Sequence, residues 1–204
     1  MNKMTGYILY KNHVAMQHEN AFKVFADFIH HVKPERVLEI GTADGGLTLA
    51  IRDMLNANQL FSSSVRSFDV NSRPSYDSLR DENIEIIVEN IFDDTYSSII
   101  NTELIIPFIQ QPGTTLVLCD GGYKVGEFNL LSAYIKDGDY IMAHDYIDTE
   151  ENFILNYYNK IWNWQEIKEV DIREACSKYQ LVDFNKESFN SVVWTCKRKQ
   201  FILS

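Results

Sequence analysis

The sequence predicts one doubly wound α/β domain, and three observations lead to this prediction. The chain has 204 residues, of which 45% are hydrophobic, so it can bury one sizeable core. Only 9 residues are glycine and 4 are proline, and no stretch resembles a linker or a low-complexity tract. Short, unbroken apolar runs alternate with segments of helical spacing, which is typical of parallel strands covered by helices on both faces.

The first third of the chain predicts a helix, a strand and a second helix. Residues 17–32 have apolar side chains at helical spacing, and Pro34 ends this helix. Val37, Leu38 and Ile40 form a short apolar run that ends at Gly41, and helical spacing resumes at residues 47–55. This order places Gly41 where a parallel strand meets its crossover helix.

The same alternation continues until the C-terminal part, where it changes. The pattern predicts further strands at residues 65–70, 84–88, 115–119 and 140–143, and helices near residues 75–79, 95–110, 125–135 and 150–162. Two strand-like runs follow at residues 179–184 and 191–197, and the short connection between them indicates an antiparallel hairpin. We therefore expect a Rossmann-like sheet of five parallel strands plus a C-terminal antiparallel hairpin, in a single domain 1–204.

Two parts of the sequence are expected to lie against this sheet. Residues 1–34 are predicted to form an N-terminal segment and helix that cover the site, and the alternative for the segment is simple packing on the sheet. Trp162 and Trp164 are expected to fill the core or an interface, because large aromatic side chains dominate buried area, and covering the acceptor site is the alternative.

Composition and charge exclude several classes of protein. The 19 basic and 29 acidic residues give a net charge of −10, which repels nucleic-acid phosphates and anionic membrane surfaces. No apolar run approaches the roughly 20 residues that cross a bilayer, and the N-terminus lacks the apolar stretch of a signal peptide, so we expect a cytoplasmic protein. The widely spaced Cys119, Cys176 and Cys196 are expected to be reduced thiols.

A glycine-rich loop, EIGTADGG at residues 39–46, follows the first predicted strand. Glycines at such a turn let the backbone approach a ligand, and the start of the next helix faces that ligand. An ordinary α/β turn is the alternative. If the loop binds a cofactor, the residues expected to contribute are Glu39, Gly41, Thr42, Ala43 and Gly45.

Ionisable residues stand at the ends of three more predicted strands. Asp69 ends the second strand, where a carboxylate can accept both hydroxyls of a bound ribose or cap the next turn. Asp120 follows the fourth strand, and His144 and Asp145 end the fifth. Because neighbouring parallel strands end at one edge of a sheet, these three side chains could ligate a divalent cation, with solvated loop carboxylates as the alternative.

Two stretches and the hairpin ending resemble a known family. The resemblance is carried by AMQHENAF…PERVLEIGTADGGLTL and LVLCDGGYKVGEFNLLSAYIKDGDYIMAHDY. They are similar to the cephalosporin hydroxylase-like and sugar O-methyltransferase branch of the class I S-adenosylmethionine (SAM)-dependent methyltransferases, and more distantly to catechol-type O-methyltransferases. The likeness covers residues 15–147. Ala43 replaces the second glycine of many members, and Tyr123 stands where members often have histidine.

The resemblance also implies a metal and a base. Acidic metal ligands occupy the positions matching Asp120 and Asp145, to which proximity adds His144. Asp120 is expected to contact the cofactor as well. Mg²⁺ would lower the pKa of an acceptor hydroxyl, and Lys124 or His144 is the candidate general base. A solvated residue at a helix start is the alternative for Lys124.

These features together imply SAM-dependent O-methylation of a small hydroxylated molecule. The resemblance places Asn90, Ile91 and Phe92 at the adenine. Two other functions stay open: a metal-independent N-methyltransferase and a non-catalytic SAM-binding or nucleotide-binding module of the same fold. The Asp/Asn-Pro-Pro-Tyr/Phe loop of many enzymes that methylate amino groups of nucleic acids is absent after Leu118, which disfavours the first. The sequence gives no indication of the oligomeric state.

Overall fold

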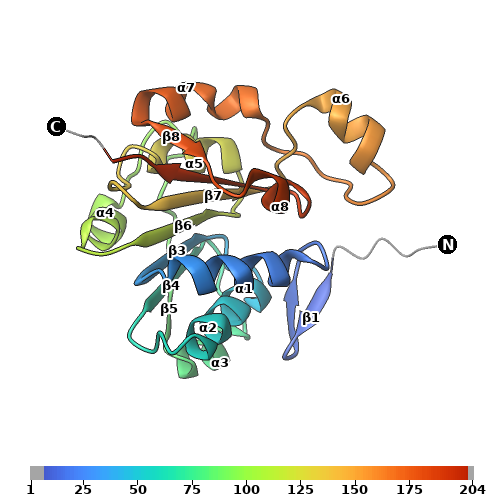
Figure 1. The fold of residues 1–204 in the computed structure, drawn as a ribbon. Coiled ribbons are helices and arrows are strands. Elements are labelled where there is room, and N and C mark those ends of the chain that lie inside the picture. Colours follow the sequence, from blue (N-terminus) through green and yellow to red (C-terminus); the bar gives the residue numbers. More distant parts are fainter. Residues whose placement is uncertain (1–6, 202–204) are drawn as a thin grey trace.

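The fold is built on a seven-stranded sheet. The computed structural model describes residues 7–201, so residues 1–6 of the predicted N-terminal segment lie outside the described part. The sheet runs through the middle of the molecule with helices on both faces (Figure 1). Its strands, in spatial order, are β5 (Ile84–Val88), β4 (Ser64–Asp69), β3 (Arg36–Ile40), β6 (Thr115–Cys119), β7 (Tyr140–His144), β9 (Trp194–Lys199) and β8 (Leu181–Asp183).

The strand directions confirm the predicted Rossmann-like sheet. β3 to β7 pair in parallel, whereas β9 is antiparallel to both β7 and β8. The chain leaves β3 toward β4 and β5 and then returns to place β6 on the other side of β3. In open α/β sheets, such a reversal creates a crevice at the carboxyl ends of the strands, where ligands bind.

Helices cover the sheet in two layers that belong to two hydrophobic cores. One core joins the sheet to α1 (Ala21–Val32), α2 (Gly46–Ala57), α3 (Tyr76–Asp81) and α8 (Lys186–Asn190). The other joins it to α4 (Thr102–Gln110), α5 (Lys124–Leu131) and α7 (Glu169–Tyr179). The short α6 (Glu150–Asn152) and a π-helical turn at Phe153–Tyr157 stand apart from both layers (Figure 1).

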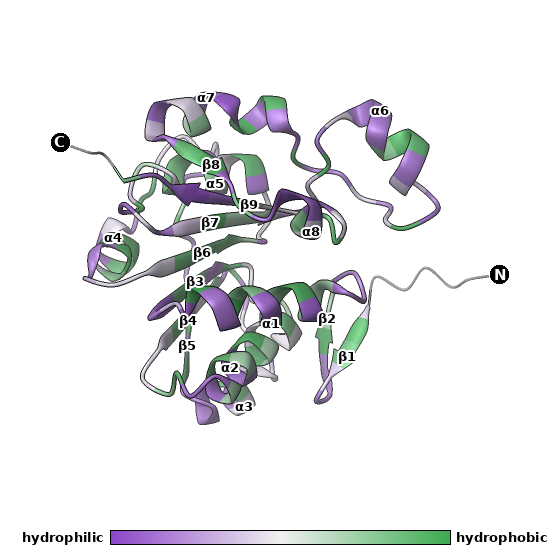
Figure 2. Ribbon diagram, viewed as in Figure 1, coloured by the Kyte–Doolittle hydropathy of each residue, from purple (hydrophilic) through white to green (hydrophobic). Residues whose placement is uncertain are grey.

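The central strands are apolar on both faces, as the unbroken runs in the sequence predict. Val37 belongs to one core and its neighbour Leu38 to the other, and both are fully buried. Figure 2 shows the resulting hydrophobic strands in the interior and hydrophilic residues on the outer sides of several helices. Among residues 7–201, no helix combines the length and apolarity that a bilayer crossing requires.

Several predicted boundaries differ from the structure for local reasons. The first helix begins at Ala21 rather than at residue 17. Residues 95–101 are not helical, because the Asp93 carboxylate accepts hydrogen bonds from the backbone and side chains of Thr95 and Ser97 and holds a turn. The helix expected at residues 150–162 is reduced to α6 and the π-helical turn.

Three elements were not predicted at all. An N-terminal hairpin pairs β1 (Ile8–Tyr10) with β2 (His13–Ala15). Helix α7 buries only Ile172 and Ala175 among its residues, too few to give a clear helical period. The connection between the last two strands contains the five-residue helix α8.

Candidate functional site

The carboxyl ends of the central strands open into one cleft made of two adjoining pockets. The pockets hold about 280 and 220 Å³ and share Gly41, Ala43, Asp120 and Gly121. We call the larger one the charged pocket, because its lining includes Glu39, Asp120, Lys124, His144, Asp145 and Glu166. We call the other the apolar pocket, because its lining includes Ile40, Phe68, Val70, Ile91, Phe92 and Tyr96, together with Asp69 and Asn90.

The cleft gathers nearly all of the residues predicted as a site. Thr42 lines the charged pocket with Glu39, whereas Asp69, Asn90 and Ile91 line the apolar pocket. Gly45 lines neither pocket. Its backbone is left-handed at φ +83°, and a side chain there would collide with Leu79, so this glycine serves the turn and its packing.

The glycine loop crosses between the two pockets at Gly41. This residue has a φ of +92°, and a Cβ there would collide with the backbone carbonyl of Asp120. The contact joins the end of β3 to the loop after β6 and leaves no room for a larger residue. Ala43, which replaces a glycine of the resembled family, also has a left-handed backbone, with a φ of 48°.

Glu39 is buried at the base of the charged pocket. One of its carboxylate oxygens accepts hydrogen bonds from Thr48 Oγ1 at 2.6 Å and Ser67 Oγ at 2.5 Å. Burial raises the pKa of Glu39 to about 8, although these two hydrogen bonds act to lower it. The glutamate therefore holds a proton near neutral pH and can ionise when positive charge enters the pocket.

Asp69 links two loops at the entrance to the apolar pocket. Its Oδ2 accepts from the backbone N–H of Ala43 at 2.8 Å, and its Oδ1 accepts from that of Asn71 at 2.9 Å. Each carboxylate oxygen has a second lone pair, so both can accept a further hydrogen bond from a ligand. In the same pocket, Phe92 stacks on Tyr96 with ring centroids 5.1 Å apart.

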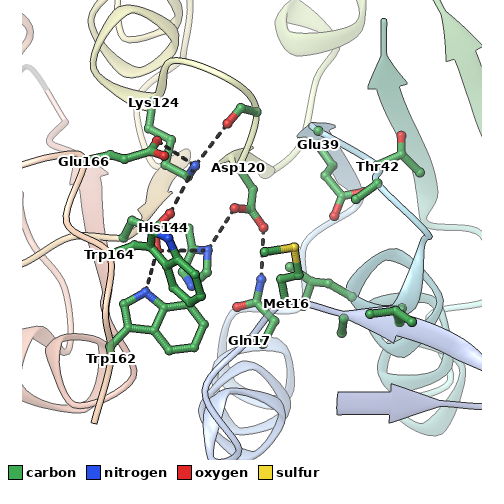
Figure 3. Close-up of a pocket in the computed structure, with 18 residues that line it drawn as sticks. Met16, Gln17, Glu39, Thr42, Asp120, Lys124, His144, Trp162, Trp164 and Glu166 are labelled. Carbon is green, nitrogen blue, oxygen red and sulfur yellow. Dashed lines mark hydrogen bonds and ion pairs between the residues drawn. The ribbon is translucent and has the colours of Figure 1, made fainter. Parts of the chain in front are cut away.

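A tight network holds the side chains of the charged pocket (Figure 3). Asp120 accepts from His144 Nδ1 at 2.9 Å through one oxygen and from Gln17 Nε2 at 3.0 Å through the other. Gln17 in turn accepts from Trp194 Nε1 at 2.8 Å. Asp145 accepts a 2.6 Å hydrogen bond from Trp162 Nε1. Strand ends, the segment after β2 and the loop after the π-helical turn therefore meet here.

Lys124 lies among oxygen atoms at the first position of α5. Its ammonium contacts the Gly121 carbonyl at 3.0 Å, Glu166 Oε2 at 2.8 Å and Asp145 Oδ2 at 3.2 Å. Burial acts to lower the pKa of Lys124, but the carboxylates of Asp120 and Asp145 and the hydrogen bond to Glu166 raise it overall. A permanently protonated ammonium is a poor proton acceptor, so this environment is unfavourable for the predicted role of Lys124 as a general base.

His144 shares with Lys124 a pKa raised by the same carboxylates, but its neutral ring has one unprotonated nitrogen. Because a carboxylate can only accept, Nδ1 carries the proton that is shared with Asp120, and the lone pair of the neutral ring is on Nε2. Nε2 is buried and has no hydrogen-bond partner among the described residues. Burial acts to lower the pKa of His144, but the negative charges of Asp145 and Asp120 outweigh it and raise the pKa overall.

The predicted metal ligands lie together, but their donor atoms do not fit a divalent cation. All four carboxylate oxygens of Asp120 and Asp145 already face a side-chain N–H group, and one of these groups is the Lys124 ammonium. The Nδ1 of His144 is a donor and offers no lone pair. Within residues 7–201, no group of three or more His, Cys, Asp or Glu side chains is arranged to hold a metal ion.

Sequence reasoning missed several residues of the charged pocket. Gln17 and Glu166 line it and were not predicted. Met16, in the segment expected to cover the site, lines it too, and so do Trp162 and Trp164; Trp162 also packs in a small buried cluster, as expected. Trp162 is buried, whereas Trp164 is 45% exposed at the pocket. Met16 and Gln17 lie in the stretch AMQHENAF that carries the resemblance, but nothing in that stretch gives Gln17 a role. No motif marks Trp162, Trp164 or Glu166, since they reach the cleft from a segment without recognisable spacing to the strand ends.

Strand β2 and the residues directly after it cover part of the charged pocket. Val14 and Ala15 line it, and a Cβ on Gly46 would lie 2.7 Å from the Ala15 nitrogen. The Asp44 carboxylate accepts from the Val14 N–H at 2.6 Å and so fastens the hairpin to the glycine loop. The described part of the segment 1–34 thus lies at the site and packs on α2 as well.

Comparisons with known proteins identify the fold. No family model matches the chain, and no curated protein matches it. Among solved structures, apo CmcI is 13% identical with a TM-score of 0.64, covering 96% of this chain and 77% of that chain. CmcI with Mg and SAM is 14% identical, with a TM-score of 0.61 and coverage of 94% and 76%. A putative O-methyltransferase from Klebsiella pneumoniae is 12% identical, with a TM-score of 0.53 and coverage of 90% and 81%. The chain therefore has the class I methyltransferase fold predicted from the resemblance.

Proposed function

We propose that this protein is a SAM-dependent methyltransferase that transfers the methyl group to an oxygen of a small hydroxylated molecule. One observation carries the proposal. The apolar and charged pockets share the glycine loop and Asp120, so a single ligand can have its nucleoside in one pocket and its reactive end in the other. CmcI, which binds SAM, has the same fold.

The apolar pocket suits the adenosyl part of the donor. The Asp69 carboxylate can accept hydrogen bonds from both ribose hydroxyls, because each of its oxygens keeps one free lone pair. Ile91 and Phe92 offer apolar surface to the face of a purine, and Asn90 offers polar groups to its edge. The positive sulfonium would then lie toward the carboxylates of the charged pocket, which attract it.

The charged pocket suits the reaction itself. The hydroxyl oxygen of the acceptor forms a bond to the methyl carbon while the carbon–sulfur bond breaks and its electron pair stays on sulfur. The hydroxyl proton passes to Nε2 of His144 in its neutral form, whose ring Asp120 holds through Nδ1; because Nε2 is buried, the bound acceptor has to displace the side chains that cover it. The products are a methyl ether, S-adenosylhomocysteine and an imidazolium ion that returns its proton to water.

The Mg²⁺ expected from the resemblance is not part of this proposal, because the side chains that would hold it are engaged with one another and with Lys124. No step is assigned to a metal. The size of the acceptor is limited by the cleft, whose lining includes the exposed side chains of Met16 and Trp164.

Titration calorimetry with SAM tests the donor site. We expect binding by the wild-type protein and a loss of about 1.5–3 kcal/mol in Asp69→Ala, or roughly 10- to 100-fold in Kd, because charge-assisted hydrogen bonds to the ribose disappear. Asp77→Ala, which removes an exposed carboxylate on α3, is the matched control and should bind SAM normally. Unchanged affinity in Asp69→Ala would remove this residue from the donor site.

Radioactive methyl transfer from SAM tests the reaction. The purified protein would be incubated with pools of phenols, sugars and amines, and product ethers would be distinguished from methylamines by mass spectrometry. We expect labelled ethers. Labelled methylamines would indicate the N-methyltransferase alternative, and SAM binding without turnover on any pool would indicate the binding module.

A further inference from the structure

We propose that the Lys124 ammonium is a built-in cation that occupies the place of the divalent metal expected from the resemblance, so that the site works without a metal ion. The position of the ammonium follows from the contacts of Lys124 alone. Its catalytic consequence rests on the proposed methyl transfer.

The coordination of Lys124 is complete. An ammonium group has three N–H donors, and three oxygens lie within 3.2 Å of Nζ: the Gly121 carbonyl, Asp145 Oδ2 and Glu166 Oε2. Only 5% of the residue is exposed. Two of these oxygens belong to carboxylates, so the positive charge is balanced in place and needs no further partner.

Lys124 contacts one of the two carboxylates expected to hold a metal and lies in the same pocket as the other. Asp145, which it contacts, and Asp120, which lies in the same pocket, are the two acidic residues that correspond to metal ligands in the resembled family. A divalent cation near these carboxylates would stand within a few ångströms of the ammonium, and like charges at that distance repel strongly in a buried site. The cation would also have to displace Gln17, Trp162 or His144 from the carboxylate oxygens.

A fixed ammonium can supply the charge that a metal would supply. Negative charge develops on the acceptor oxygen as its proton leaves, and Lys124 lines the same pocket as His144. A cation held in place before the reaction stabilises that charge without reorganisation. Lys124 then acts as an electrostatic stabiliser and His144 as the proton acceptor.

Manganese binding measured by electron paramagnetic resonance tests the spatial claim on the whole 204-residue chain, with Mn²⁺ as the probe. We expect no saturable Mn²⁺ binding by the wild type up to millimolar concentration. Lys124→Ala frees the carboxylates of Asp145 and Glu166 and the Gly121 carbonyl, so it should bind one Mn²⁺ with at least tenfold higher affinity than the wild type. Lys124→Arg keeps the positive charge and should bind none.

A second control tests whether removing a buried lysine from between any two carboxylates creates a Mn²⁺ site. Lys197 is also buried and lies between Glu169 and Asp183, at 3.0 and 2.6 Å, outside the cleft. Lys197→Ala should gain no Mn²⁺ site of comparable affinity. An equal increase in Mn²⁺ affinity in Lys124→Ala and Lys197→Ala would mean that Lys124 does not occupy a metal position, and would overturn the proposal.

Two further outcomes also overturn it. One is stoichiometric Mn²⁺ binding by the wild type with a Kd below about 1 mM, which needs no variant and decides the question even if Lys124→Ala does not fold. The other is a folded Lys124→Ala that binds no Mn²⁺. SAM titration in EDTA is run in parallel: absence of SAM binding would defeat the proposed function but leave the manganese result standing, so the two failures are distinguishable.

Discussion

The two pockets of the cleft differ in what holds their side chains. In the apolar pocket, backbone N–H groups hold the polar side chains in place. Asp69 is fixed by the N–H groups of Ala43 and Asn71, and Asn90 accepts from the N–H of Phe92. Two of these three hydrogen bonds are made within two residues of the side chain, directly after the strand ends.

In the charged pocket, the polar side chains are held by side chains from segments far away in the sequence. Gln17 reaches Asp120 across 103 residues and Trp194 across 177. Trp162 holds Asp145, and Glu166 holds Lys124 across 42 residues. The apolar pocket therefore follows from the strand-to-loop turns, whereas the charged pocket exists only when the N-terminal segment and the loop after the π-helical turn have docked.

The largest expected effect comes from the loop that both pockets share. Gly41→Ala places a Cβ against the Asp120 carbonyl in a left-handed backbone. Strain of about 1–3 kcal/mol and overpacking of about 1–3 kcal/mol should together remove roughly 2–6 kcal/mol of stability. Urea unfolding measures the loss, and calorimetry should show that SAM binding is lost too.

Gly122→Ala is the control for this prediction. A Cβ there would meet only the Tyr96 hydroxyl, at an ordinary 3.5 Å, so stability should change little. If Gly41→Ala were as stable as Gly122→Ala, the two pockets would not be joined by the close contact at Gly41.

A smaller effect, on stability and methyl transfer but not on SAM affinity, is expected from a substitution in the charged pocket. Gln17→Ala leaves Trp194 Nε1 and one oxygen of Asp120 without partners, which should cost about 1–3 kcal/mol of stability. Methyl transfer should fall, because Asp120 no longer has a fixed orientation toward His144. SAM affinity should stay within about threefold if the apolar pocket binds the nucleoside independently.

Gln165→Ala is the matched control, since the Gln165 side chain makes a single 3.1 Å hydrogen bond to a backbone carbonyl outside both pockets. Its stability and turnover should be close to those of the wild type. A loss of SAM affinity in Gln17→Ala as large as that in Asp69→Ala would contradict the separation of the two pockets.

The smallest expected effect is a pH dependence at Glu39. Its pKa rises from 4.5 to about 8 on burial, so the folded chain holds a proton that the unfolded chain releases in this window. The stability contributed by the proton is fully present below pH 4.5 and is lost as the pH rises toward 8. Between pH 6 and pH 7 this amounts to at most about 1.4 kcal/mol.

Glu39→Gln removes the titration while keeping the shape of the side chain. Its Tm should fall less than that of the wild type between pH 6 and pH 7, by about 3–5 °C. Glu151→Gln, at an exposed glutamate, controls for the loss of one charge. Parallel Tm curves for the wild type and Glu39→Gln would mean that Glu39 is ionised throughout this range.

Much of the fold could be predicted because each central strand is marked by its own residues. The bounds predicted for β5 and β6 are those of the structure, since both are rich in apolar residues and stand between turn residues. Helix α7 escaped prediction because it is anchored by few buried side chains. Likewise, Asp69 could be predicted as a candidate from its place at a strand end, but Gln17 has no such place.

The sequence by itself determined the parallel sheet, its C-terminal hairpin and the residues at the strand ends, because hydrophobic period and glycine position are local properties of the chain. Tertiary structure alone decided which of those residues form hydrogen bonds and ion pairs with one another. It brought Lys124 between Gly121, Asp145 and Glu166, and it gave His144 to Asp120. Such choices depend on distances of about 3 Å between segments far apart in the chain, which no spacing along the sequence records.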